Sequence, residues 1–297
     1  MKIFDLISMC LRNLFRRRLR TVLTVIGVVI GTCSIVIMIS IGIGMNKSQE
    51  ESLKEMGDLT LIEIYNYGND SSTSGTQLND TTLADIAAQA HVVCTTPFYN
   101  MNVNASLQIT SGTGGRYQSY LDVVGVYPDA LAALGYEVKE GTLFTGEEKD
   151  LALLFGEQYA YNFRDTKKNY NNYVNAVPDE TGVLPDPFVN PVEDKFKLEI
   201  ETWNNSTGAS KTSTQDVEVC GVLVGDTSKG YQTLYSVFAD INQLKKLEET
   251  INKQSGQKTS HKEVNYNNAK VKVDSVENVE EVEEYIKSLG FETYSME

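Results

Sequence analysis

The stretch RNLFRRRLRTVLTVIGVVIGT, residues 12–32, decides the fold, because five arginines lead directly into an uncharged apolar segment. The 26 residues from Thr21 to Asn46 include no Asp, Glu, Lys or Arg. Roughly 20 apolar residues in a helix cross the hydrocarbon core of a bilayer, so this segment is long enough to do so. A cleavable signal peptide has a shorter apolar region, and the core helix of a soluble protein carries a polar stripe that is missing here. We therefore predict a transmembrane helix over residues 21–46.

The charges around this helix predict its orientation. Residues 1–20 contain six basic side chains and one acid, whereas the whole chain has a net charge of −14, which leaves −19 for the remainder. Basic residues next to a membrane span stay on the cytoplasmic side. We expect a single-pass protein of the plasma membrane with a cytoplasmic N-terminus and an extracytoplasmic remainder. The acidic remainder argues against nucleic acid as a partner.

Residues 1–20 have the pattern of an amphipathic helix that lies in the membrane interface and contacts lipids. Its basic residues have two interpretations, a simple positive-inside anchor or a cytoplasmic docking surface for a partner subunit. The residues concerned are Arg12, Arg16, Arg17, Arg18 and Arg20. Within the span, Gly27, Gly31 and Ser34 place small residues on one helix face, where they would allow close packing of a second helix.

The rest of the chain has a mixed α/β pattern. Residues 47–57 continue the helix as a short charged stalk that ends near Gly57. Alternating or β-branched runs predict strands at 59–67, 92–96, 102–110, 117–127, 195–203, 216–225, 269–275 and 291–297. Helical periodicity predicts helices at 81–90, 128–136, 156–165 and 276–290. Hairpin turns are expected at GTGG (112–115) and at 204–212, and the last three elements form a β-α-β unit.

Two parts of this region have no assigned element, residues 137–155 and 226–268. Residues 166–194 are rich in Asn, Tyr and Pro and hold four of the six prolines, so they predict a surface insertion. The fold class expected from this pattern is α+β: one interfacial helix, one transmembrane helix, and a mixed α/β domain outside the membrane.

Motifs for catalysis and nucleotide binding are missing from the sequence. Neither a G-x-x-x-x-G-K-[ST] loop nor an H-E-x-x-H or G-x-S-x-G motif occurs, and the chain has only two histidines. The paired glutamates at 280–281 and 283–284 flank apolar residues at helical spacing, which predicts a solvated helix face. We expect a chain that is not an enzyme and holds no metal or cofactor.

The four cysteines divide into two pairs. Cys10 and Cys33 fall in the interfacial and membrane helices, where they are expected to be small apolar residues. Cys94 and Cys220 fall in strands outside the membrane, where a disulfide is permitted but not required. The distance between them cannot be derived from the sequence, so the sequence does not decide whether Cys94 and Cys220 form a disulfide.

Residues 11–44, LRNLFRRRLRTVLTVIGVVIGTCSIVIMISIGIG, resemble the start of MacB-type (macrolide exporter, FtsX-like) permeases of ABC transporters. In that family an L-R-N-L-x-R-x-x-L-R-T core leads into the first membrane helix, which ends in a G-x-G step, here Gly42-Ile43-Gly44. Looser similarities occur at 122–144, where Thr142 replaces the usual arginine, at 155–165 and at 216–223. The insertion at 166–194 has no counterpart.

The resemblance implies a permease with four membrane helices that works as a homodimer or permease heterodimer. A cognate ABC ATPase subunit would bind ATP, and a membrane-fusion adaptor would be a further partner. The outer domain, residues 58–297, would have a first lobe at about 58–135 and 230–297 and an inserted lobe at about 136–229. Because the chain ends at Glu297, before a second membrane helix, we expect either a truncated permease or a single-pass relative.

Three functions stay open at this point. The first is a permease-type subunit of an ATP-driven export or mechanotransmission complex. The second is a component of a related lipoprotein-releasing permease. The third is a single-pass surface protein that binds or senses a ligand and dimerises through Gly27 and Gly31.

Overall fold

The computed structural model describes residues 18–56, 58–66, 76–204, 206–257 and 264–295. The chain divides into two compact units, residues 1–56 and residues 57–297, and the second is called the α/β domain below. The predicted interfacial helix falls mainly on residues 1–17, outside the described residues. The fold class is confirmed: one long apolar helix precedes a mixed α/β domain.

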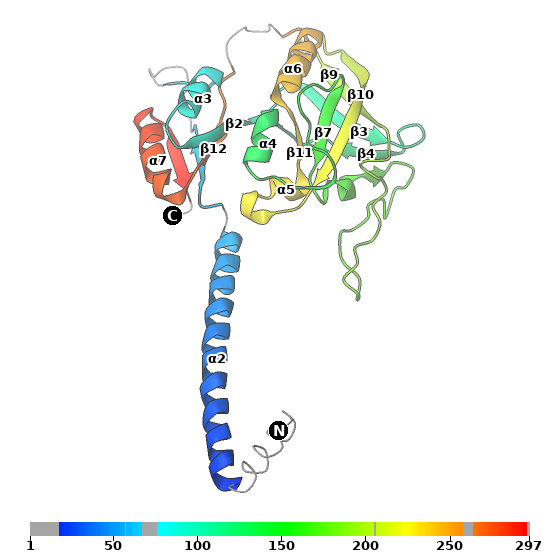
Figure 1. The fold of residues 1–297 in the computed structure, drawn as a ribbon. Helices are drawn as coiled ribbons and strands as arrows, with labels where there is room; N and C mark the ends of the chain where they lie inside the picture. Colours follow the sequence, from blue (N-terminus) through cyan, green and yellow to red (C-terminus); the bar gives the residue numbers. More distant parts are fainter. Residues whose placement is uncertain (1–17, 57, 67–75, 205, 258–263, 296–297) are drawn as a thin grey trace. The chain divides into compact units, whose positions relative to one another are not determined.

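Helix α2 forms the first unit and runs without interruption from Arg18 to Met56 over 39 residues (Figure 1). It contains no proline, and its apolar part consists mainly of Val, Ile and Leu. Residues 18–49 are long and apolar enough to cross a membrane by length and composition, and none of the most apolar window is buried within the structure. The predicted span and stalk are therefore segments of one helix.

The α/β domain contains thirteen strands and several short helices among the described residues (Figure 1). The strands are β1 (Leu61–Tyr65), β2 (Val92–Asn100), β3 (Ala105–Ser111), β4 (Tyr117–Tyr120), β5 (Val123–Val126), β6 (Val138–Gly141), β7 (Leu151–Phe155), β8 (Arg164–Asp165), β9 (Phe196–Trp203), β10 (Ser210–Leu223), β11 (Val237–Asp240), β12 (Asn268–Val273) and β13 (Glu292–Ser295). The helices are α3 (Asp80–Ala87), α4 (Pro128–Ala133), α5 (Gln232–Tyr235), α6 (Ile241–Ser255) and α7 (Val279–Ser288), with 3-10 turns η1 (Tyr159–Asn162), η2 (Thr227–Lys229) and η3 (Val276–Asn278).

Four strands from the two ends of the domain form sheet A, in the order β13-β1-β12-β2. Neighbouring strands are antiparallel, and Ile62 and Ile64 of β1 point into a core with α3 and α7. Asn79 is the N-cap residue of helix α3: its side-chain Oδ1 accepts a hydrogen bond from Thr82 N at 2.9 Å. The predicted β-α-β closure is confirmed as β12, α7 and β13.

The remaining strands form sheet B, in the order β5-β11-β7-β10-β9-β3-β4-β8, with β6 paired to β10. The pairs β5–β11 and β7–β10 are parallel, and the others are antiparallel. Strand β7 is buried on both faces: Leu153 and Phe155 enter one core, with α6, and Ala152 and Leu154 enter another, with α4. A continuous apolar run without alternation is typical of such a strand.

Strand β2 joins the two sheets. Residues 92–98 pair with β12 in sheet A, and the last two residues, Tyr99 and Asn100, pair with Gly125 and Val124 of β5. The residues of β3 to β5, which fall within the predicted first lobe, are strands of sheet B. The lobe boundaries themselves stay a prediction.

Most predicted elements are present, but two differ from the prediction and several were not predicted. Residues 117–127 form two strands, β4 and β5, because the first half pairs with β3 and the second with β2 and β11. The predicted helix at 156–165 is only the 3-10 turn η1 followed by β8, and its Tyr159, Ala160 and Phe163 are buried in a core. Residues 137–155 and 226–268, for which the sequence predicted no element, contain the strands β6, β7 and β11 and the helices α5 and α6.

Candidate functional sites

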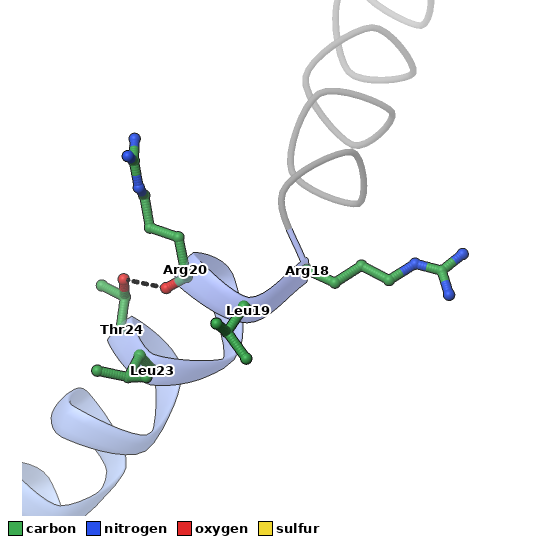
Figure 2. A pocket seen from close by; sticks show the side chains of 5 residues that line it. All are labelled: Arg18, Leu19, Arg20, Leu23 and Thr24. Carbon is green, nitrogen blue, oxygen red and sulfur yellow. Dashed lines mark hydrogen bonds between the residues drawn. The ribbon is translucent and has the colours of Figure 1, made fainter.

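Two of the five arginines that were predicted to form an anchor or a docking surface lie at the start of α2. Arg18 and Arg20 extend in different directions from the first turn, and with Leu19, Leu23 and Thr24 they line an open hollow of 590 Å³ (Figure 2). The hydroxyl of Thr24 donates to the carbonyl oxygen of Arg20 at 2.7 Å. The other three arginines, Arg12, Arg16 and Arg17, lie outside the described residues. Their role as an anchor or a docking surface stays a prediction.

The small residues of α2 lie on a helix whose apolar part is exposed almost throughout. A Cβ atom added at Gly27 or Gly31 would meet no other atom within 4 Å. Ser34 Oγ donates to the Ile30 carbonyl at 2.8 Å, so this hydroxyl is satisfied within its own helix. Such internal bonding is what a helix in lipid requires, because no water is present to satisfy polar groups. Packing of a second helix on the face of Gly27 and Gly31 stays a prediction.

The two outer cysteines are not brought together. Cys94 lies on β2 and Cys220 on β10, with β5, β11 and β7 between them in the strand order, and both are free cysteines. Burial raises the pKa of the Cys94 thiol, and burial together with Glu148 and Glu218 raises the pKa of Cys220 to about 11. The permitted disulfide is absent from the structure. Oxidation of the pair stays a prediction, which mass measurement with and without reductant would test.

An ion pair with a buried carboxylate anchors the insertion at 166–194, which Figure 1 shows as a long loop before β9. Arg116, at the end of the β3–β4 turn, donates from Nε and Nη2 to the two carboxylate oxygens of Asp165 at 3.0 and 2.7 Å. Asp165 is fully buried, and hydrogen bonding to Arg116 lowers its pKa to about 2. Tyr117 stacks on Phe188 at 5.1 Å between ring centroids. The predicted surface insertion is therefore tied to the neighbouring hairpin at both of its ends.

The glutamates of α7 differ in their surroundings. Glu280, Glu281 and Glu284 are exposed, as a solvated face predicts. Glu283 is the exception: it is 8 % exposed and accepts a hydrogen bond from Thr293 Oγ1 at 2.5 Å, with Lys287 Nζ at 3.0 Å. This carboxylate holds β13 to α7, so it has a structural role.

A histidine clasp joins the start of β2 to the end of β12. His91 has a φ of 68°, in the left-handed region that non-glycine residues seldom adopt. Its carbonyl oxygen accepts from Asp274 N at 2.9 Å, and its Nδ1 lies 3.0 Å from Asp274 Oδ2. Asn278 Nδ2 donates to the other oxygen of Asp274 at 2.8 Å. The hydrogen bond to Asp274 raises the pKa of His91, and Glu281 acts in the same direction.

We expect the stabilising effect of this clasp to decrease with increasing pH. The folded pKa of His91 is above the unfolded value of about 6.5, so its contribution is complete below that value and is lost as the pH rises through the folded pKa. The Tm of the wild type should exceed that of His91→Asn most at pH 5.5, and less at pH 8. Asparagine tolerates the left-handed backbone, which isolates the effect of the ring.

The control for this prediction is Asp274→Asn, which removes the carboxylate and leaves the histidine. In that background, adding His91→Asn should produce a much smaller pH-dependent difference in Tm, because only the weaker effect of Glu281 on His91 is left. An imidazole NMR titration identifies His91 by the signal that the variant lacks, since the chain has two histidines. A Tm difference that is the same at both pH values would contradict the clasp.

Among the described residues, no group of three or more His, Cys, Asp or Glu is placed to hold a metal ion. A polar hollow of 390 Å³ lies at the start of α6, lined by residues that include Glu148, Asp240, Gln243 and Lys246. Gln243 spans it, accepting from Ala152 N and donating to the carbonyls of Glu148 and Asp150. These side chains tie the 146–151 loop to α6, a role that sequence analysis missed because it assigned no helix there.

The described residues thus contain one apolar helix of membrane-spanning length, followed by a mixed α/β domain. The family described as MacB-like periplasmic core domain matches residues 21–289. The chain belongs to this family, as a MacB-like extracytoplasmic domain of the ABC transporter permease type. The resemblance predicted from residues 11–44 is thereby confirmed.

Curated relatives are similar over part of their length. The macrolide export ATP-binding/permease protein MacB 2 of Yersinia pestis bv. Antiqua (strain Antiqua) is 27 % identical over 147 residues, which are 48 % of this chain and 20 % of that protein. An uncharacterized ABC transporter permease of Methanocaldococcus jannaschii is 33 % identical over 70 residues, 23 % of this chain and 18 % of the relative. The chain thus matches about a fifth of the length of these relatives.

Two solved structures are similar to the chain. One is the extracellular domain of the noncanonic ABC-type transporter YknZ from Gram-positive bacteria, with a TM-score of 0.43, 14 % identity, and coverage of 80 % of this chain and 100 % of that one. The other is the periplasmic region of MacB from Actinobacillus actinomycetemcomitans, with a TM-score of 0.42, 13 % identity, and coverage of 81 % and 91 %.

Proposed function

We propose that the chain is the first membrane helix and extracytoplasmic domain of a permease-type subunit in an ATP-driven export or mechanotransmission complex. The observation that carries this proposal is the family match over residues 21–289, which includes α2 as well as the α/β domain. Curated relatives named macrolide export ATP-binding/permease proteins support the export function. In this proposal the domain outside the membrane responds to ATP hydrolysis on the cytoplasmic side.

In this proposal ATP is bound outside residues 1–297, which contain no G-x-x-x-x-G-K-[ST] loop. A cognate ABC ATPase is the expected partner at the cytoplasmic end, where Arg18 and Arg20 stand at the start of α2. A second permease chain is the proposed occupant of the Gly27 and Gly31 face. A membrane-fusion adaptor outside the membrane is a further proposed partner.

The orientation is proposed with the N-terminus in the cytoplasm, since the basic residues precede α2. A cysteine at position 170 tests it, because Tyr170 is 87 % exposed in the α/β domain. In a chain whose four cysteines are alanine, Tyr170→Cys should react with a membrane-impermeant maleimide on intact cells. The cysteine-free chain is the control. Reaction only after permeabilisation, or release of the chain by salt washing, would overturn the orientation.

The transport function is tested by purifying the gene product with its genomic neighbours in mild detergent. We expect an ATPase to co-purify, and its hydrolysis to drive release of small amphiphiles from cells. Coupling to release of lipoproteins would assign the chain to the lipoprotein-releasing class instead. Purification without any ATPase, together with binding of a soluble ligand, would favour a surface sensor and overturn the proposal.

A further inference from the structure

The chain passes between the two sheets at few places. It enters sheet B along β2 and returns to sheet A between α6 and β12. Strand β2 is the direct link, because Phe98 is its last residue paired in sheet A and Tyr99 is its first paired in sheet B. The sheet A body is sheet A with α3 and α7, and the sheet B body is sheet B with α4, α5 and α6; within the one compact unit they can rotate about β2 only where the side-chain contacts between them break.

Four polar side chains connect the bodies on one side of β2. Asp80 at the start of α3 and Tyr266 just before β12 belong to the sheet A body, whereas Lys245 of α6 and Tyr127 after β5 belong to the sheet B body. Lys245 Nζ donates to Asp80 Oδ2 at 2.7 Å and to Tyr266 OH at 2.6 Å. Tyr266 OH donates to Asp80 Oδ1 at 2.5 Å, and Tyr127 OH donates to the same oxygen.

The carboxylate of Asp80 is the centre of this network. Burial acts to raise the pKa of Asp80, but the hydrogen bonds from Lys245, Tyr127 and Tyr266 outweigh it and leave the pKa below its ordinary value. The Asp80 side chain is 51 % exposed and that of Lys245 is 21 % exposed, whereas Tyr266 is buried. Water can therefore replace the charged partners at modest cost, which suits a contact that opens and closes.

Apolar packing joins the bodies on both sides of β2, since Ile241 of α6 and Tyr99 are buried with Val271 in the core of sheet A. Successive residues of a strand point to opposite faces, so Phe98 faces away from Tyr99. Phe98 packs edge to face on Phe238 of β11 at 6.1 Å, within a core that includes Leu131 and Leu154. The buried Lys270 of β12 adds a bond to the carbonyl of Lys229 at 3.0 Å. Separation on this side would expose a packed core.

We propose that Asp80, Lys245, Tyr127 and Tyr266 form a latch that holds the two sheets closed on the Tyr99 side of β2. When the latch breaks, the α/β domain opens about β2 and pivots on the Phe98 core. Tyr99 is next to the latch, and its hydroxyl donates to Glu248 of α6, which keeps this end of β2 attached to the sheet B body. This inference concerns the domain itself and does not depend on the transported substrate.

The latch is tested by measuring the distance between two spin labels in the full chain in detergent. The labels replace Asp85 on α3 and Thr250 on α6, which are both exposed, in a chain whose native cysteines are alanine. The unaltered latch should give one narrow distance distribution. Lys245→Met should raise the ratio of open to closed molecules roughly tenfold, since it removes two charge-assisted hydrogen bonds. A second, longer distance would then be visible.

The matched control is Lys253→Met on the same helix, because the ion pair that the described residues give Lys253 is a local one with Glu249, at 3.9 Å. It should leave the distance distribution unchanged. Tyr127→Phe removes a single hydroxyl and provides a milder variant if Lys245→Met does not fold, as judged by circular dichroism. If both latch variants fold and keep the narrow wild-type distribution, the latch does not exist.

Discussion

Replacing Phe155 with alanine is expected to lower the free energy of unfolding by about 3–5 kcal/mol, the range for truncating a buried aromatic residue. Phe155 is fully buried in β7. Its ring contacts those of Tyr159, Phe196 and Phe163, with centroid distances of 4.7, 5.6 and 6.4 Å. Because typical domains are stable by only 5–15 kcal/mol, this single change should remove a large fraction of the stability.

Urea denaturation of the full chain in detergent measures this effect, with fluorescence of Trp203, the single tryptophan, as the reporter. The control is Tyr170→Ala, which truncates an aromatic residue that is 87 % exposed and should change the free energy of unfolding by less than about 0.5 kcal/mol. A loss below about 1 kcal/mol for Phe155→Ala would show that this core is not packed as described.

The second large effect is expected at the contact between β6 and β10. Gly141 has a φ of 82° and is paired with Gly221. A Cβ atom at position 141 would lie 2.2 Å from the Cys220 carbonyl oxygen and 2.6 Å from Gly221 Cα, which are backbone atoms that cannot move aside. Gly141→Ala should therefore lower the free energy of unfolding by about 2–5 kcal/mol, the sum of left-handed strain and overpacking.

The insertion provides a matched control for this substitution. Gly182 also has a φ of 82°, but a Cβ atom there would meet nothing within 4 Å. Gly182→Ala should lower the free energy of unfolding by about 1–2 kcal/mol, the cost of placing alanine in the left-handed backbone region. The same urea titration compares the two variants. Equal losses would mean that the close approach of β6 and β10 has no energetic consequence.

Some of what the sequence analysis missed was available in the sequence. Helix α6 has apolar residues at 241, 244, 247 and 251, which is helical spacing, and all four are buried. Asp240 caps its first turn by accepting from Asn242 N at 2.9 Å, and Gly256 follows its last residue with a φ of 74°. These are recognised start and stop signals. An element at 241–255 could have been predicted from them.

Other features could not be derived from local patterns. The division of residues 117–127 into β4 and β5 depends on which strands lie beside each half. Arg116 and Asp165 are 49 residues apart in the chain, and Asp80 and Tyr266 are 186 apart. Nothing in the neighbouring sequence of any of these residues indicates its partner. Only the paired strands bring them within hydrogen-bonding distance.

The sequence by itself determined the membrane-length helix, the mixed α/β class and most strands, because length, charge and hydrophobic period are properties of consecutive residues. The tertiary structure decided the strand order, the switch of β2 between the two sheets, the anchoring of the insertion and the network around Asp80. The physical reason is that strand pairing and ion pairing are made between distant segments. Their energies depend on which surfaces meet, and the periodicity of one segment is compatible with many partners.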